Sequence, residues 1–141
     1  MKMMYPSKIK TMMLFLDDIR IPSDCSTYMH LRIGKDNTLY LKEWTIVKNY
    51  NEFIRTITDN YFIITHISFD HDLGEDVAIK LRNNGFSKRK ARQSKKEVKS
   101  GYDCAKWMKE FYTKHSISQP ILFVHSMNPT GTENIINLFK K

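Results

Sequence analysis

The chain has 141 residues, 41% of them hydrophobic, which is enough for one globular domain (1–141) with a core of its own. Its two cysteines are too few for a disulfide scaffold, and its apolar run at residues 12–16 is too short for a signal peptide or membrane span, so we expect a cytoplasmic protein with no membrane partner. The net charge of +8 lies entirely within residues 80–100, which hold nine basic residues and one acidic residue, so the rest of the chain is neutral.

The first half of the chain predicts two strands, a hairpin and a helix. Residues 12–16 form the short apolar run that is typical of a strand buried on both faces. Residues 28–33 and 38–41 alternate between apolar and polar side chains, which predicts an inserted hairpin. A second strand follows at 44–47, and Asn51 is placed to cap a helix with one apolar side. That side consists of Phe53, Ile54, Ile57 and Phe62.

The second half continues to alternate strands with helices. Strands are predicted at 62–69 and 120–124, with a helix at 101–115 and a last helix opened by a capping box at 130–133. The basic residues 80–100 are predicted to form an inserted loop. This alternation is typical of an α/β fold with a short parallel sheet.

Three of the predicted strands end abruptly in charged or polar side chains. The carboxyl ends of parallel strands meet at one edge of a sheet, and the ligand crevice of open α/β sheets lies there. We therefore expect these side chains to converge on one crevice. They are Asp17 and Asp18 after the first strand, Asp70, His71 and Asp72 after the third, and His125 and Ser126 after the last.

The four acids at these strand ends suit a hard cation. Asp70 and Asp72 are two residues apart in an extended chain, so they project to the same side. Together with Asp17 and Asp18 they supply the oxygen ligands that Mg²⁺ or Mn²⁺ prefers, and no other cofactor is indicated. The alternative is an arrangement without metal, in which the acids pair with basic residues such as Arg20.

Two histidines are the predicted acid/base groups. An imidazole titrates nearest neutral pH, and His71 and His125 each follow a predicted buried strand. Asp70 and Asp18 are the acids predicted to take part in catalysis with them. The other three histidines lie in hairpin, strand and helix-end contexts and are assigned no role.

Several groups are predicted to bind the phosphate of a ligand. The Ser126 hydroxyl could hold a phosphate oxygen, and Asn128 and Gly131 lie in a tight turn whose backbone N–H groups face an anion. The basic loop could fold over the crevice as a lid, or it could serve only solubility. The predicted set is Arg20, Ser126, Asn128, Gly131, Lys88, Arg89 and Arg92.

Four short motifs occur in a fixed order along nearly the whole chain. They are Leu14–Arg20, Ser68–Gly74, Gly101–Asp103 with Trp107, and His125–Gly131 with Asn134. In these motifs the chain resembles the cyclic-phosphate processing receiver-like domains, relatives of response-regulator receivers found in bacteria and phages. The resemblance implies a flavodoxin-like, three-layer fold that processes a cyclic phosphate at an RNA end or in a nucleotide.

The resemblance also bears on the individual residues. It aligns Asp17 and Asp18 with the metal-binding acids of a receiver, and Asp70 with its phosphoacceptor. A receiver needs a lysine after its last strand, however, and His125 and Ser126 stand there in this chain. Phosphoryl relay is therefore disfavoured.

The sequence favours a hydrolase, namely a phosphoesterase that acts on a 2′,3′-cyclic phosphate RNA end or a cyclic nucleotide. One alternative is a protein that binds and sequesters a cyclic nucleotide without catalysis. Another is a basic nucleic-acid-binding module driven by residues 80–100, with salt-sensitive affinity. The oligomeric state does not follow from the sequence.

Overall fold

The computed structural model describes residues 10–28 and 37–140, and its centre is a four-stranded parallel sheet. The strands are β1 (Met12–Leu16), β2 (Thr45–Val47), β3 (Ile64–Phe69) and β4 (Ile121–Val124), in the order β2-β1-β3-β4. Leu14 on β1 lies beside Thr45 on β2 and Ile67 on β3, which in turn lies beside Leu122 on β4. The predicted parallel α/β sheet of flavodoxin-like type is confirmed.

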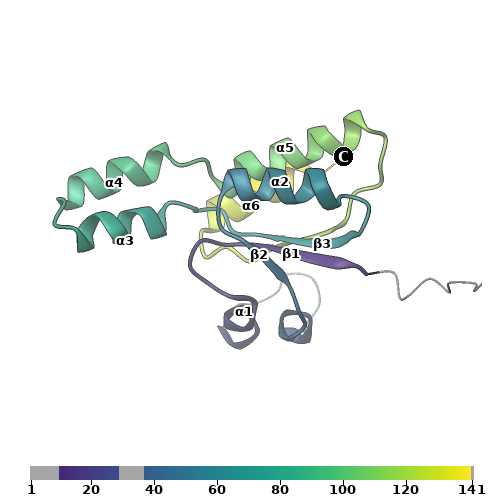
Figure 1. The fold of residues 1–141 in the computed structure, drawn as a ribbon, viewed down its shortest axis with the longest axis horizontal. Coiled ribbons are helices and arrows are strands. Elements are labelled where there is room, and N and C mark those ends of the chain that lie inside the picture. The colour runs from purple at the N-terminus through teal and green to yellow at the C-terminus, as the bar shows by residue number, and fades with distance from the viewer. Residues whose placement is uncertain (1–9, 29–36, 141) are drawn as a thin grey trace, which may run out of the picture.

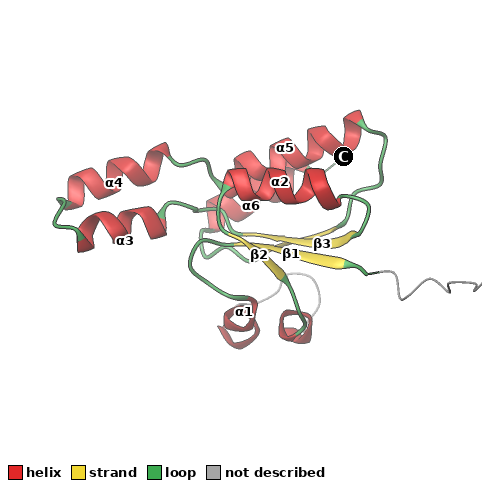
Figure 2. Cartoon of the chain, in the orientation of Figure 1, coloured by secondary structure: helices red, strands yellow, loops and turns green. Residues whose placement is uncertain are grey.

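Helices cover both faces of this sheet and make three layers (Figure 1). One face carries α2 (Tyr50–Asn60), α5 (Gly101–Lys114) and α6 (Pro129–Leu138), and the other carries α1 (Pro22–Tyr28) and the 3-10 helix η1 (Asn37–Leu41) (Figure 2). Within the described residues, no helix has both the length and the apolar composition needed to cross a membrane.

The alternation of side chains along β1 divides the core between the two faces. Leu14 and Leu16 pack into the larger cluster beneath α2, α5 and α6. Phe15 points the other way, against Tyr40 and Trp44 of the smaller cluster. All three β1 side chains are fully buried, as expected for a central strand with both faces covered.

The predicted second strand of the inserted hairpin, residues 38–41, is wrong. Residues 38–41 belong to η1, and residues 29–36 lie outside the described part of the chain. Tyr40 turns inward and Trp44 Nε1 donates to the Leu39 carbonyl at 3.0 Å, so this segment packs on the sheet instead of extending it. The apolar alternation of four residues fits a 3-10 turn as well as a short strand.

Two predicted helix starts are also corrected. Asn49, not Asn51, caps α2 by accepting a hydrogen bond from the Glu52 N–H. Asn128, not Thr130, caps α6 by accepting from the Gly131 N–H. Phe62, assigned to the buried side of α2, follows the end of that helix and is 72% exposed.

The predicted basic loop is instead a pair of helices. These are α3 (Glu75–Asn83) and α4 (Lys88–Glu97), which we call the arm, and they project past the end of the sheet (Figure 1). Gly85 turns the chain between them at φ 88°, a conformation that glycine adopts without strain, and Ser87 caps α4. Lysine and arginine are good helix formers, so a run of them after a cap favours helix over loop.

Candidate active site

Five carboxylates surround one cavity at the carboxyl ends of β1 and β3. The cavity has a volume of about 370 Å³ and also holds the Arg20 side chain. It is lined by Asp17, Asp18, Ile19, Arg20, Asp70, Asp72, Glu75, Met127 and Asn128. The structure thus brings the four acids of the predicted metal set together with Arg20 and Asn128. Glu75 was missed in the sequence, although it follows the Asp70–Asp72 run at the start of α3.

Asp17 is held by hydrogen bonds to both of its carboxylate oxygens. Its Oδ1 accepts from the backbone N–H groups of Ile19 and Arg20, each at 2.9 Å, and its Oδ2 accepts from His125 Nε2 at 3.0 Å. Burial alone would raise the pKa of Asp17, but the hydrogen bonds from His125, Ile19 and Arg20 outweigh it and leave the pKa below its ordinary value. Asp17 is therefore a fixed anion.

Asp70 is the acid of this cavity that titrates near neutral pH. Burial, followed by the nearby charge of Asp17, raises the pKa of its carboxyl from 3.8 to about 7. Arg20 Nη2, 3.6 Å from Asp70 Oδ1, and the His71 backbone N–H at 2.9 Å offset only part of this rise. A group with this pKa can both give and take a proton under physiological conditions.

Asp18 and Asp72 have additional roles within the fold. Asp18 Oδ2 accepts from the Asp76 N–H at 2.8 Å and so caps α3, whose own cap residue is the glycine Gly74. Burial is the main reason that the pKa of Asp18 is raised. Asp72 pairs with His71 Nδ1 at 3.0 Å and accepts a long hydrogen bond of 3.4 Å from the Asn128 side chain.

His125 lies beneath the cavity, not within it. Its side chain is fully buried, stacks on Phe15 with ring centroids 4.2 Å apart, and does not line the cavity. Its Nδ1 lies 2.7 Å from Ser68 Oγ, which lies 2.7 Å from the Tyr40 hydroxyl. The expectation that His125 opens into the shared crevice is therefore corrected.

The direction of this buried hydrogen-bond chain follows from the acceptor at its end. The ionised Asp17 only accepts, so the proton of His125 is on Nε2. Burial lowers the pKa of His125, so the imidazole is neutral, and its Nδ1 accepts from the Ser68 hydroxyl, which accepts from Tyr40. Every polar group in this series from Tyr40 to Asp17 has a partner, and His125 acts as a positioning residue for Asp17.

His71 faces away from the acidic cavity. It lines a separate pocket with Ser100 and Tyr102, and its ring packs on Gly131. A Cβ at Gly131 would lie 2.4 Å from the His71 Cγ, so the glycine makes this contact possible. The two histidines predicted as an acid/base pair thus do not share one cavity.

The predicted anion-binding turn uses its polar groups internally. The Gly131 N–H donates to Asn128 Oδ1 at 2.9 Å, and Ser126 Oγ accepts from the Asn128 N–H at 3.1 Å. Gly131 is buried, and neither it nor Ser126 lines the acidic cavity. Of the turn residues assigned to phosphate, only Asn128 lines the acidic cavity.

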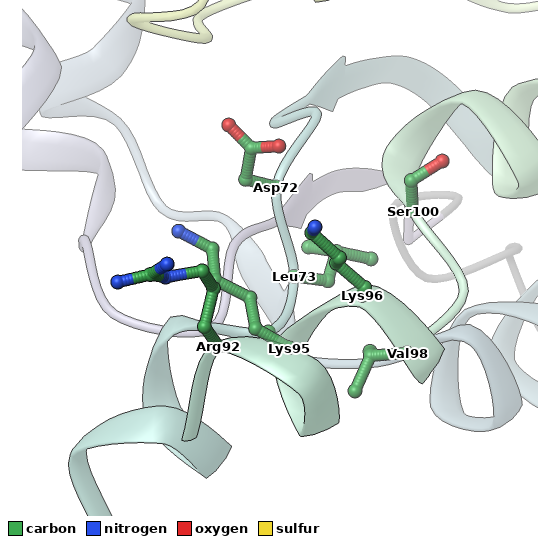
Figure 3. Close-up of a pocket in the computed structure, with 8 residues that line it drawn as sticks. Asp72, Leu73, Arg92, Lys95, Lys96, Val98 and Ser100 are labelled. Atoms are coloured by element: carbon green, nitrogen blue, oxygen red, sulfur yellow. The ribbon is translucent and has the colours of Figure 1, made fainter. Parts of the chain in front are cut away.

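Three of the four basic residues assigned to phosphate lie on α4, outside the acidic cavity. Lys88 and Arg89 are the first two residues of that helix. They line neither the acidic cavity nor the second cavity, which lies beside it. Arg92 lines this second cavity, which it shares with Asp72 (Figure 3).

Ser68 and Tyr40 were not identified from the sequence. Ser68 is a polar residue between the apolar residues Ile67 and Phe69 of β3, which is the signal that could have pointed to it. Tyr40 is carried by η1, far away in the chain, and its role depends on the tertiary fold.

A pair of tyrosine variants tests the buried hydrogen-bond chain. Tyr40→Phe removes the donor to Ser68 and should lower the free energy of unfolding by about 1 kcal/mol. Tyr112→Phe is the matched control, because the Tyr112 hydroxyl is buried without a hydrogen-bond partner among the described residues and its removal should not destabilise. Urea unfolding of both variants measures the difference. Equal losses in the free energy of unfolding would contradict the proposed series of hydrogen bonds.

The donor set of the cavity fits a divalent cation. Within the described residues, Asp17, Asp70 and His125 each offer a ligand atom, and these atoms lie within 4.8 Å of one another. Asp17 Oδ2 and His125 Nε2 already form a hydrogen bond with each other, so an ion would be held by the carboxylate oxygens that line the cavity. Repulsion between neighbouring carboxylates contributes to the raised pKa values of Asp18 and Asp70. A bound cation would relieve this repulsion.

Comparison with known proteins identifies the family of the chain. A family model described as "Cyclic-phosphate processing Receiver domain" matches residues 12–141, which include every strand and helix of the structure. No curated protein and no solved structure matches the chain. Since the family model extends over more than nine-tenths of the sequence, the chain belongs to the cyclic-phosphate processing receiver domain family.

Proposed function

We propose that the protein is a phosphoesterase that opens a cyclic phosphate by hydrolysis in the acidic cavity. The observation that carries this proposal is the Asp70 carboxyl, whose pKa of about 7 suits proton transfer and which lies beside the Arg20 guanidinium. The family description, cyclic-phosphate processing, supports a phosphate-bearing substrate.

The reaction needs one proton donor and one acceptor. Water attacks phosphorus and forms a new P–O bond while the bond from phosphorus to one ring oxygen breaks. Protonated Asp70 gives its proton to the leaving oxygen, and Asp18, whose raised pKa makes it a stronger base than a free aspartate, takes the proton lost by the water. The product is an acyclic phosphate monoester.

Arg20 and a cation offset the negative charge that the substrate meets. Arg20 lines the cavity among five carboxylates, so an anionic phosphate is repelled unless more positive charge is present. We propose Mg²⁺ or Mn²⁺, which would be held by Asp17 and Asp72, so that Asp70 keeps the proton that it donates and Asp18 stays free to act as the base. The ion would neutralise phosphate oxygens. Arg20, which lies beside Asp17 and Asp70, then orients the phosphate.

Turnover of defined cyclic phosphates tests this function. The protein is incubated with 2′,3′-cyclic and with 3′,5′-cyclic nucleotides, with Mg²⁺, Mn²⁺ or a chelator, and the products are identified by mass. We expect addition of one water, abolished by chelator, and a loss of at least about 10²-fold in Asp70→Asn. Asp59→Asn, on the exposed surface of α2, is the matched control. Recovery of every ligand unchanged would overturn the enzyme proposal.

A non-catalytic nucleotide binder is the second candidate, and one observation favours it. His71 and His125 do not face one cavity, so the pair that would share acid/base work is not assembled. Such a binder would return stoichiometric ligand intact from the same incubation, and Arg20→Gln would weaken binding through lost hydrogen bonds.

A further inference from the structure

We propose that the cavity between the arm and the start of α5 binds a backbone phosphodiester of a polynucleotide whose terminal phosphate enters the acidic cavity. The placement of the terminal phosphate in the acidic cavity rests on the proposed function. The inference narrows the substrate class from cyclic phosphates in general to the ends of polynucleotides.

Three basic side chains of α4 line this cavity. It has a volume of about 350 Å³ and lies beside the loop that follows β3. Arg92, Lys95 and Lys96 extend from α4 toward the loop that carries Asp72, and Ser100 lies at the opposite side (Figure 3). Its lining is Asp72, Leu73, Gly74, Arg92, Lys95, Lys96, Val98 and Ser100.

The basic cavity adjoins the acidic one. Asp72 lines both cavities. Lys95, which lines the basic cavity, forms an ion pair with Glu75, which lines the acidic one. A ligand with two neighbouring phosphates can therefore reach both cavities, whereas a mononucleotide with one cyclic phosphate cannot fill them together.

Two of the basic side chains carry charge that the fold does not neutralise. Among the described residues, no acid forms an ion pair with Arg92 or Lys96, whereas Lys95 and Lys80 are paired with Glu75 and Asp76. Unpaired cations at a cavity attract an anion, and a guanidinium suits phosphate oxygens in particular.

Packing fixes the basic helix against the site. A Cβ at Gly74 would lie 2.7 Å from the Lys95 carbonyl oxygen and 2.9 Å from the Lys95 Cα, so this glycine lets the backbone of α4 approach the loop after β3. Ala91 is buried in the same helix. The basic side chains are thus held beside the acidic cavity by contacts of the folded backbone.

A basic stripe along α4 continues from the cavity toward the tip of the arm. Arg89, Arg92 and Lys96 are spaced i, i+3 and i+7, so they share one helix face over about 10 Å. All of the chain's excess charge lies in residues 80–100. A polynucleotide repeats one negative charge per nucleotide, so a row of cations that leads into a phosphate site matches its backbone.

Fluorescence anisotropy of labelled oligonucleotides tests the proposal. The probes are an RNA of about eight nucleotides that ends in a 2′,3′-cyclic phosphate, the same RNA with a 3′-hydroxyl, and a DNA of the same sequence. The double variant Arg92→Gln/Lys96→Gln should bind the cyclic-phosphate RNA at least about tenfold more weakly and reduce the slope of log K against log salt by about 1.4, for two lost contacts. Lys106→Gln/Lys114→Gln, on exposed positions of α5, removes the same charge and should change neither quantity.

The outcomes separate this proposal from the phosphoesterase itself. Weaker oligonucleotide binding in the α4 double variant alone supports the basic cavity even if no ligand is hydrolysed, and a shared loss for DNA and RNA assigns the contact to the backbone. Equal loss in both double variants overturns the cavity while turnover stands. Hydrolysis of 2′,3′-cyclic mononucleotides with no tighter binding of the RNA also overturns it. So does binding to phosphatidylserine vesicles without binding to any oligonucleotide.

Discussion

Replacing Asp70 with asparagine is expected to stabilise the fold above neutral pH while it lowers turnover by at least about 10²-fold. The folded protein holds the proton of Asp70 more tightly than the unfolded chain does, because burial and Asp17 raise the pKa from 3.8 to about 7. The stability that this proton contributes is complete below about pH 4 and is lost as the pH rises through 7. Asparagine is neutral at every pH, so the variant does not lose it.

The size of this effect follows from the pKa difference. A rise from 3.8 to about 7 corresponds to at most about 4 kcal/mol at pH 8. Urea unfolding of Asp70→Asn and of the wild type from pH 4 to pH 8 should give a difference in the free energy of unfolding that grows with pH. The lowered pKa of His125 acts on both proteins, so it cancels in the difference.

Added cation should reproduce part of the same stabilisation. Mg²⁺ or Mn²⁺ that binds the folded acids should raise the wild-type melting temperature at pH 8, and should raise that of Asp70→Asn less. Asp59→Asn, which leaves the cavity intact, should respond to the ion like the wild type. A pH-independent difference between Asp70→Asn and the wild type would contradict the raised pKa.

The positions of the acids could be predicted from the sequence because they depend on strand ends alone. In a parallel sheet the carboxyl ends of all strands lie at one edge, and the observed strand order then makes Asp17 and Asp70 neighbours, because β1 lies beside β3. The backbone shows this directly, since the Asp70 N–H donates to the Leu16 carbonyl at 2.9 Å.

The burial of His125 could not be predicted in the same way. Its N–H still donates to the Phe69 carbonyl, so the chain stays in the sheet for one residue beyond the apolar run of β4. With the strand period of two, His125 therefore lies on the side of Phe123, over the smaller core cluster. An apolar run that ends in a polar residue does not reveal whether that residue has left the sheet.

The two helices of the arm do not follow from the sequence, because charge is the dominant signal in this segment. A run of lysine and arginine fits an exposed loop as well as an exposed helix, and α3 and α4 bury few side chains that could mark a period. The signals that were present are local. Ser87 precedes four residues that include no helix breaker, and Gly85 supplies the turn.

Replacing His125 with alanine is expected to act mainly on stability, by lowering the free energy of unfolding. We expect no direct effect on proton transfer to the substrate. The change leaves a void beside Phe15, removes the Nε2 donor from the Asp17 carboxylate and leaves the Ser68 hydroxyl without its acceptor. Loss of a buried partner of a charged group, together with a cavity, costs about 3–5 kcal/mol.

His71→Ala is the matched control, because its ring is partly exposed and forms a hydrogen bond with Asp72. It should cost about 1 kcal/mol, measured by urea unfolding alongside His125→Ala. His125→Gln fills more of the void, and its amide can still donate to Asp17, so its loss should fall between the two. If His125→Ala instead folds with wild-type stability and loses only turnover, His125 exchanges protons with the substrate, and its place beneath Asp17 is not its main role. The expected order of stabilities instead makes His125 the support that keeps Asp17 anionic and fixed, which leaves Asp70 as the group that moves the proton.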